Sequence, residues 1–448
     1  MLLPHSLFRR RLRLMLLAGL ASAAAALWML PGRHDQPAQP FDAGELEERH
    51  PLVWKHIHSF DGIGGAWYIP PAWIPPTQPP PKTILDAALL ASKAALSVPE
   101  RRRRRLAYSN IPLLMHQTGP SSKVNTWKPE VVPWVEQWLE HAVSPHADTA
   151  AMAYFFWDDE GIDMFMHEYE KDFMGDFKNM FTPVERADIF RILACKYLGG
   201  VYADIDTQPL RPPATWIGPA DLTPWTDDLT NKTHGSSHLD HHPNATTTTT
   251  ARQPVVNLLW GIEADTDPSS NAYWRMGYTY PIQLTQWALA SSPGHPALDQ
   301  FMDNLRAEVR LEKENAMGGG DDDDDDDDVG NGNSRADPLT RTGPAAVTLA
   351  TIQWLARESQ DFRWNSLTGL KDGGKSKLVQ DVLILPITGF SPGRGTYGNM
   401  GSKPISHPDA RLVHHALGSW KKFDWLVEYG KFCRTAFGLC RDWTKVVS

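Results

Sequence analysis

Cysteine is scarce in this chain, which has three such residues in a length of 448. These are too few for a scaffold held together by several disulfides, and none has the spacing of a zinc ligand. Cys195 lies in an apolar stretch and is expected to be a buried thiol. Cys433 and Cys440 stand seven residues apart, and they form either a disulfide in an oxidising compartment or two free thiols.

A strong excess of charge is also missing once a single run is set aside. The formal net charge is −9, but residues 321–328 are eight consecutive aspartates. Removing these eight charges from −9 leaves −1, so the rest of the chain is nearly neutral. A protein that binds nucleic acid needs a basic surface for the phosphates. We therefore expect no nucleic acid among its partners.

Long hydrophobic runs are absent except near the N-terminus. Residues 14–30 form an apolar run at the short end of what spans a bilayer, and arginines at positions 9–11 and 13 precede it. Because such arginines stay in the cytosol, the pattern predicts a cytosolic tail (1–13), a transmembrane signal anchor (14–30) and a luminal remainder. A cleaved signal peptide is the alternative, since the alanines at 21–26 offer cleavage sites.

Residues 31–106 have the composition of a luminal stem. Prolines cluster at 69–82, which favours an extended and semi-rigid spacer over packed structure. Residues 83–97 have helical composition and are expected to form one amphipathic segment.

From residue 107 to 448 the pattern is that of an α/β domain with a mainly parallel central sheet flanked by helices. Apolar strand-like segments alternate there with helical ones. The expected strands are 111–116, 151–158, 201–206, 255–264, 381–387 and 410–416, and the expected helices are 128–142, 163–174 and 182–198. Trp287 lies in a helix-like stretch, 283–290, and is expected in the core.

Two low-complexity segments, 221–253 and 315–337, interrupt this order and are expected to be loops. The first contains two glycosylation sequons, at Asn231 and Asn244. Both suit an exposed loop of a luminal protein.

The helix expected at 182–198 carries strong start and stop signals. Thr182 is a plausible N-cap, Pro183 suits the first helical position, and Glu185 completes a capping box. Gly199-Gly200 follows the helix and can adopt the backbone angles that a C-cap needs.

The short strand after these glycines places polar groups on one face. Side chains alternate along a strand, so Tyr202, Asp204 and Asp206 are expected to point to the same side. Carboxylates at the C-terminal end of a strand can hold Mg²⁺ or Mn²⁺, which neutralises a departing diphosphate. A lone D-x-D triplet is more often a pair of solvated aspartates, but the capped helix and the paired glycines favour a metal site. A glycoside hydrolase also uses two carboxylates, but these come from separate elements and lie about 5 to 9.5 Å apart. A single D-x-D triplet does not supply that arrangement.

These residues resemble the DXD region of glycosyltransferase family 32. The matching positions are Ala187-Asp188, Arg191, Gly199-Gly200, Tyr202, Asp204 and Asp206. Further segments fit the same family, and they are 111–119, 261–265, 293–296, 342–344, 381–393 and 414–420. The resemblance covers about residues 107–430.

The resemblance implies a GT-A-like nucleotide-sugar-binding fold and a type II enzyme of the Golgi membrane with a luminal catalytic domain. It implies transfer of mannose from GDP-mannose to the core of N-linked high-mannose glycans, in α-1,6 linkage and with Mn²⁺ (or Mg²⁺). Net retention then follows, through a covalent intermediate or front-face attack. The alternatives are another acceptor, namely an inositol sphingolipid or an elongating mannan, and a non-catalytic subunit of a Golgi complex with other mannosyltransferases.

The resemblance also assigns roles to the central residues of the motif. Asp206 is the expected direct metal ligand, and Asp204 faces ribose and metal. Asp188 would accept hydrogen bonds from sugar or ribose hydroxyls, and Arg191 would stabilise the site's carboxylates or the donor. Tyr202 would pack on the nucleoside or form a hydrogen bond with it.

Other polar residues are candidates for the donor, acceptor or metal site. The sequence also allows a purely structural role for several of them. His116 and Gln117 end the first strand, where a nucleobase docks or a polar strand end simply occurs. Glu263 and Asp265 could meet the sugar or acceptor, or form a structural salt bridge. The C-terminal candidates are His414 and His415 for the metal and Ser419 and Trp420 for the donor, and only one of the two adjacent histidines can face the site.

Overall fold

The computed structural model describes residues 41–97, 104–143, 150–235, 255–270, 273–318, 337–395, 398–418 and 425–440. The chain divides into a large unit, Pro40–Lys421, and a small unit formed by Met1–Gln39 and Lys422–Val447. The expected anchor at 14–30 lies outside the described residues, as do Asn244, Ser419 and Trp420. Among the residues that are described, no helix has both the length and the apolar character needed to cross a bilayer.

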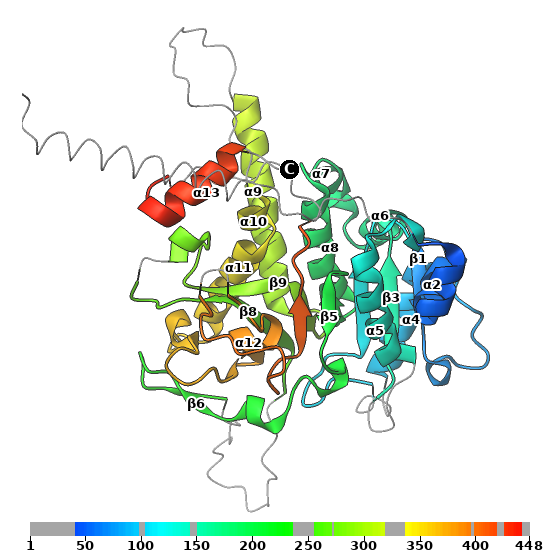
Figure 1. Ribbon diagram of the computed structural model, residues 1–448, viewed down its shortest axis with the longest axis horizontal. Coiled ribbons are helices and arrows are strands. Elements are labelled where there is room, and N and C mark those ends of the chain that lie inside the picture. Colours follow the sequence, from blue (N-terminus) through cyan, green and yellow to red (C-terminus); the bar gives the residue numbers. More distant parts are fainter. Residues whose placement is uncertain are drawn as a thin grey trace, which may run out of the picture. The chain divides into compact units, whose positions relative to one another are not determined.

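An eight-stranded mixed sheet forms the centre of the large unit (Figure 1). In spatial order its strands are β1 (Gly65–Tyr68), β3 (Ala153–Trp157), β2 (Leu114–Thr118), β4 (Gly200–Ala203), β9 (Ile282–Ser291), β8 (Leu258–Asp265), β11 (Val382–Leu385) and β10 (Lys377–Val379). The pairs β2–β3, β2–β4 and β8–β11 are parallel, whereas β1–β3, β4–β9, β8–β9 and β10–β11 are antiparallel. The α/β class is confirmed, but the expected mainly parallel pairing is not.

The strand β9 accounts for much of this difference. Its stretch 283–290 was expected to be helical, yet it forms an antiparallel strand between β4 and β8. All ten residues of β9 are buried, so no polar face alternates with an apolar one. A strand covered on both faces lacks the period of two by which strands are usually predicted.

Helices cover this sheet (Figure 1). Those of the large unit are α2 (Ala43–Arg49), α3 (Pro51–Val53), α4 (Ile84–Leu96), α5 (Val132–Val143), α6 (Asp159–Tyr169), α7 (Met174–Lys178), α8 (Pro183–Tyr197), α9 (Pro296–Gly318), α10 (Pro338–Arg341), α11 (Pro344–Glu358) and α12 (Ile387–Phe390). The helix α8 packs against β2, β4 and β9, while α11 packs against β9 and α9. The core between sheet and helices is built mainly of aliphatic and aromatic side chains.

The segment 41–97 differs from the expected stem, because it is part of the folded unit. The strand β1 extends the central sheet by pairing with β3. The alanines of α4 are buried against it, as the exposures of Ala87, Ala88 and Ala91 show. The helix expected at 83–97 is confirmed, whereas the proline-rich stretch 69–82 is the connection between β1 and α4. A proline-rich connection and a proline-rich spacer have the same amino-acid composition, so only the packing of the chain distinguishes them.

The capped helix is confirmed in detail. In α8, Thr182 and Glu185 exchange the two hydrogen bonds of a capping box, 3.2 Å and 3.0 Å long, with Pro183 next to the cap. Gly200 follows at a φ of 110°, and a Cβ there would lie 2.5 Å from the carbonyl oxygen of Leu114. The glycine therefore allows β4 to approach β2 closely.

The structure describes residues 221–235 of the first predicted loop. Residues 221–235 include the short hairpin β6 (Trp225–Thr226) and β7 (Thr233–His234). The carboxylate of Asp227 anchors it by accepting bonds from the Ser366 hydroxyl and the backbone N–H of Arg363. Asn231 is exposed in this hairpin, as a glycosylation site requires.

The small unit contains α13 (Trp425–Phe437) among its described residues. A disulfide joins Cys433 to Cys440, so the first of the two alternatives for these cysteines is the one found. Cys195 is a free and buried thiol, as expected.

Candidate metal site

The two aspartates of the D-x-D triplet lie in a turn after β4. The strand ends at Ala203, and three residues separate it from the next strand, β5 (Thr207–Pro209). The backbone N–H of Thr207 donates to the carbonyl oxygen of Asp204 over 3.0 Å and closes the turn. The expected strand 201–206 is therefore too long, and a turn rather than strand alternation brings Asp204 and Asp206 together.

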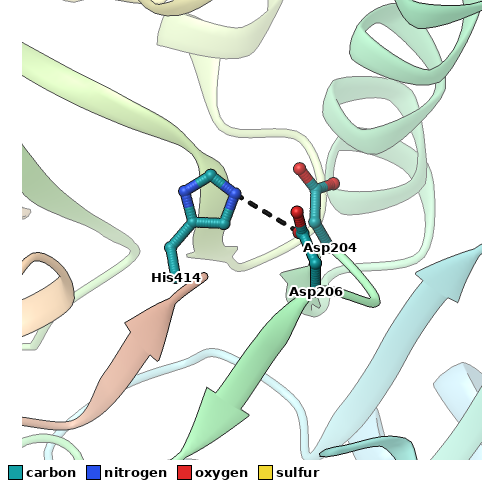
Figure 2. Close-up of side chains that lie close together, drawn as sticks. All are labelled: Asp204, Asp206 and His414. Carbon is teal, nitrogen blue, oxygen red and sulfur yellow. Dashed lines mark ion pairs between the residues drawn. The ribbon is translucent and has the colours of Figure 1, made fainter. Parts of the chain in front are cut away.

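A histidine from the far end of the chain completes the cluster. The strand β12 (Leu412–His414) pairs antiparallel with β5 and sets His414 opposite Thr207. One ligand atom each from Asp204, Asp206 and His414 lies within 4.8 Å of the others. Nε2 of His414 is 3.3 Å from Oδ1 of Asp206, and Figure 2 shows the imidazole pointing toward both carboxylates. We call these three residues the D-D-H cluster.

The cluster suits a divalent cation. Carboxylate oxygens are the ligands that Mg²⁺ and Mn²⁺ prefer, and a neutral imidazole can join them around Mn²⁺. No hydrogen bond from the described residues reaches Oδ2 of Asp204, which leaves that oxygen available. The residues present thus fit the metal that the D-x-D motif predicts.

Asp206 is held in its ionised form by its neighbours. The backbone N–H of Leu417 donates to Oδ2 over 3.0 Å. Burial acts to raise the pKa of Asp206, but the hydrogen bond and charge of His414 and the Leu417 amide outweigh it and lower the pKa. A charged carboxylate is what a cation needs.

The geometry separates the two adjacent histidines. His415 stacks on Trp134 with ring centroids 3.8 Å apart, and its Nε2 lies 3.2 Å from the side-chain oxygen of Gln208. His414 instead faces the aspartates and stacks on Trp287 at 4.5 Å. The expectation that only one of the pair faces the site is confirmed, and that residue is His414.

Asp204 is fixed from three directions. The guanidinium of Arg191 lies 3.0 Å from Oδ1, and the hydroxyl of Tyr202 donates to the same oxygen over 2.8 Å. The backbone N–H of Asp204 donates to the carbonyl oxygen of Trp287 over 2.8 Å. Burial raises the pKa of Asp204 while the Arg191 charge opposes it. These contacts hold the carboxylate in one orientation.

Tyr202 does not have the exposed ring that contact with a nucleoside requires. Its side chain is fully buried, and Arg191 lies over the ring at 5.1 Å. The hydroxyl contacts Asp204 and lies 3.1 Å from the hydroxyl of Thr118. The expected nucleoside contact is replaced by an internal role, which is to orient Asp204.

Asp188 is also an interior residue rather than a sugar contact. It is 5% exposed, lies 3.2 Å from Arg191 and accepts a hydrogen bond of 2.9 Å from the hydroxyl of Thr342. Burial raises the pKa of Asp188 to about 7, although Arg191 and Thr342 oppose this shift. Arg191 therefore links Asp188 to Asp204, in agreement with its expected role toward the site's carboxylates.

The first strand places its polar end in the core. His116 and Gln117 have no exposed surface, so neither can dock a nucleobase in this arrangement. His116 lies 3.0 Å from the carbonyl oxygen of Gly199 and accepts from the indole of Trp157, while burial lowers its pKa to about 4. Gln117 donates to the backbone oxygen of Asp204 over 3.3 Å. Both residues support the turn from behind.

Glu263 and Asp265 are not part of the D-D-H cluster. Asp265 is 1% exposed and accepts 2.7 Å bonds from the Thr368 hydroxyl and the Gly369 amide. Glu263 accepts from the side chain of Gln283 over 2.6 Å. Asp265 therefore has a structural role, as the alternative to a sugar contact proposed. Its hydrogen-bond donors among the described residues are neutral groups, so with these residues it does not form the salt bridge that was expected.

Sequence reasoning missed three supporting residues, Trp287, Thr342 and Leu417. Thr342 lies in the 342–344 segment that resembles the family, which is a signal that could have drawn attention to it. Leu417 likewise lies in the 414–420 segment that resembles the family. Trp287 acts through its ring and its backbone oxygen, and these leave no motif.

Comparison with known proteins now identifies this part of the chain. Residues 133–223 match a family model described as a glycosyltransferase sugar-binding region containing a DXD motif. The matched span includes α8, β4 and both aspartates of the cluster. Residues 133–223 are therefore similar to a DXD-type glycosyltransferase sugar-binding region.

Proteins similar to this chain include enzymes named for mannose transfer. The initiation-specific alpha-1,6-mannosyltransferase of Schizosaccharomyces pombe is 30% identical over 322 residues, a match that covers 70% of this chain and 65% of that protein. The protein of the same name in Candida albicans is 28% identical over 258 residues, covering 55% of this chain and 56% of that protein. The matches thus span less than two thirds of each of these relatives, 65% of the first and 56% of the second.

A shorter match links this chain to inositol phosphoceramide mannosyltransferase 1 of Schizosaccharomyces pombe, with 31% identity over 119 residues, or 25% of this chain and 34% of that protein. Among solved structures, the PaToxG glycosyltransferase is similar at 12% identity with a TM-score of 0.28, covering 62% of this chain and 83% of that one. So low a TM-score adds nothing to the fold described above.

Proposed function

We propose that this chain is a retaining mannosyltransferase that transfers mannose from GDP-mannose, in α-1,6 linkage, to the core of N-linked high-mannose glycans. The observation that carries the proposal is the D-D-H cluster, with ligand atoms within 4.8 Å of one another, inside and beside a DXD-type sugar-binding region. Support for mannose and for the linkage comes from the names of the relatives at 28% and 30% identity.

Asp204, Asp206 and His414 would hold the metal ion, for which Mn²⁺ is the proposed choice because a histidine joins two carboxylates. The ion, when bound, would stabilise the negative charge of the departing nucleoside diphosphate. The protein prepares the site by keeping Asp206 ionised through the Leu417 amide and His414.

Arg191 has a second electrostatic role in the proposal. It is 5% exposed and lies 3.0 Å from Asp204, so its charge offsets part of the repulsion between two neighbouring carboxylates before a cation arrives. Tyr202 and Gln117 hold the turn from behind, which keeps the carboxylates preorganised.

The proposal extends to fold type and location. A GT-A-like fold is consistent with a mixed sheet whose aspartates follow the end of β4. The apolar run 14–30 would act as the signal anchor of a type II Golgi membrane protein, with the large unit in the lumen. An exposed sequon at Asn231 fits a luminal location.

The test uses the full chain with GDP-mannose, Mn²⁺ and a reducing-end-labelled high-mannose N-glycan. The expected result is the addition of one hexose that an α-1,6-specific mannosidase removes. Asp206→Asn should abolish the addition, and the exposed Asp228→Asn should not, since Asp228 pairs with Lys371 away from the cluster.

The other results would each reject a defined part of the proposal. Hydrolysis of GDP-mannose without glycan transfer would reject the acceptor and direct the assay to inositol phosphoceramide. A folded chain that neither hydrolyses the donor nor transfers mannose would reject the enzyme and leave a non-catalytic subunit.

A further inference from the structure

A cavity lies in the N-terminal part of the large unit. No member of the D-D-H cluster lines it. Its volume is about 710 Å³, and its walls include Phe60, Asp61, Trp67, Tyr68 and Lys82. This volume falls within the range of small-molecule sites, roughly 300 to 1,000 Å³. The residues come from the segment that sequence composition had marked as a stem.

The sheet topology separates this cavity from the metal site. Trp67 and Tyr68 lie on β1, the edge strand, and β3 and β2 stand between it and β4. Three strand spacings amount to roughly 14 Å. A molecule in the cavity would therefore not be the mannose that is transferred at the cluster.

Aromatic rings form the apolar part of the wall. Phe60 and Trp67 pack edge to face with ring centroids 4.7 Å apart, which fixes the indole in place. Trp67 and Tyr68 are both half-buried, so each ring keeps an accessible surface. Rings of this kind offer flat apolar surface together with a polar tip.

The polar groups on the same wall are unused by the protein. The carboxylate of Asp61, the ammonium group of Lys82, the hydroxyl of Tyr68 and the indole N–H of Trp67 have no side-chain hydrogen bond or ion pair with the described residues. Asp61 and Lys82 are exposed. Donors and an acceptor thus surround accessible aromatic surface, which is an arrangement that suits a ligand with both apolar faces and hydroxyl groups.

We propose that this cavity is a second carbohydrate site, which binds mannose units of a glycan away from the point of transfer. A pyranose has an apolar C–H face that packs on an aromatic ring and equatorial hydroxyls that bond to carboxylate, ammonium and hydroxyl groups. A lipid tail has no hydroxyl groups and would make no hydrogen bond to Asp61, Lys82 or the hydroxyl of Tyr68. The choice of mannose, but not of a sugar, rests on the proposed function.

Such a site would keep a branched acceptor close to the enzyme between transfer events. Two linked binding sites raise the local concentration of the second branch at the catalytic site. The cavity would thereby lower the concentration of branched glycan needed for transfer and leave the donor chemistry unchanged.

The test measures binding of a high-mannose glycan to the full chain by calorimetry, without GDP-mannose. Trp67→Ala and the milder Asp61→Ala should weaken binding, the former about tenfold, because a ring contact is lost. The matched control is Trp225→Ala, another half-buried tryptophan outside the cavity. Hydrolysis of GDP-mannose should stay at the wild-type rate in all three variants.

Two results would overturn the proposal: unchanged glycan binding in both cavity variants, or equal binding of a glucose polymer that lacks mannose. Asp206→Asn separates this proposal from the proposed function, since it should abolish donor hydrolysis and leave glycan binding intact. A wild-type chain that binds the glycan through Trp67 but never uses GDP-mannose would retain the site and reject the transferase.

Discussion

The indole of Trp287 stacks on the imidazole of His414, with ring centroids 4.5 Å apart and planes 18° apart. The backbone oxygen of the same tryptophan accepts the N–H of Asp204 over 2.8 Å. One residue of β9 therefore positions two of the three members of the D-D-H cluster, one through its ring and one through its backbone.

Replacing Trp287 should weaken metal binding without touching a ligand. Trp287→Ala is expected to lower Mn²⁺ affinity about tenfold, because a ring stack is worth roughly 0.5–1.5 kcal/mol and the imidazole loses its support. Trp287→Phe keeps a ring and should stay closer to wild type. Electron paramagnetic resonance of free Mn²⁺ during titration measures the affinity directly.

Trp354→Ala is the matched control for this substitution. Trp354 is 6% exposed against 7% for Trp287, but it packs edge-on against His295. Both alanine variants should lose about 3 kcal/mol or more of stability through the cavity they create. Equal losses of Mn²⁺ affinity in the two would mean that general loosening, rather than the stack on His414, is responsible.

The adjacent histidines provide a second test. His414→Ala should reduce Mn²⁺ affinity by at least about tenfold, because it removes a ligand atom. His415→Ala should leave the affinity unchanged and cost about 1 kcal/mol in unfolding free energy, since the stack on Trp134 and the exposed contact with Gln208 are lost. A loss of affinity in His415→Ala alone would reverse the assignment of the two residues.

The raised pKa of Asp188 should make the free energy of unfolding depend on pH. Its pKa is raised from 3.8 to about 7 by burial, so the folded chain binds more protons than the unfolded chain in this window. Its contribution to stability is therefore complete at low pH and declines as pH rises toward 7, by at most about 1.4 kcal/mol per pH unit.

Asp188→Asn removes this contribution. The difference in unfolding free energy between variant and wild type should shift in favour of the variant as the pH rises from 4 to 7. Urea denaturation at several pH values measures it. A difference that stays constant, or moves the other way, would show that Asp188 is ionised throughout.

Gly200 should tolerate no side chain. Gly200→Ala places a Cβ 2.5 Å from the Leu114 oxygen at a φ of 110°, and it should cost about 3 kcal/mol or more. Gly294→Ala is the control, with a φ of 74° and nothing within 4 Å, so it should cost only about 1–2 kcal/mol. Chemical denaturation measures the unfolding free energy of both variants. If the two lose similar amounts, the positive φ, rather than the close approach of β2, is the reason that position 200 requires glycine.

Some features followed from the sequence because their causes are local. The capping box of Thr182 and Glu185 involves residues three apart, and the glycines after the helix act through their own backbone angles. The metal-binding role of Asp204 and Asp206 was predicted from the motif, although the turn that joins them was taken for a strand.

Other features could not be predicted because their causes are distant in sequence. His116 and Tyr202 look like site residues at a strand end, and only the packing of Trp157 and Arg191 against them shows that they are buried. The strand β9 lacks an alternating pattern because both of its faces are covered. The proline-rich stretch looks like a spacer until β1 is seen to pair with β3.

The sequence by itself determined the α/β class, the capped helix α8 and the pair of aspartates, since each depends on residues that are neighbours in the chain or on a short motif. Tertiary structure alone decided that His414 rather than His415 joins them, that Trp287 supports both His414 and Asp204, and that Arg191 links Asp188 to the site. The physical reason is that β5 and β12 meet across some 200 residues of chain through backbone hydrogen bonds, which no local pattern records.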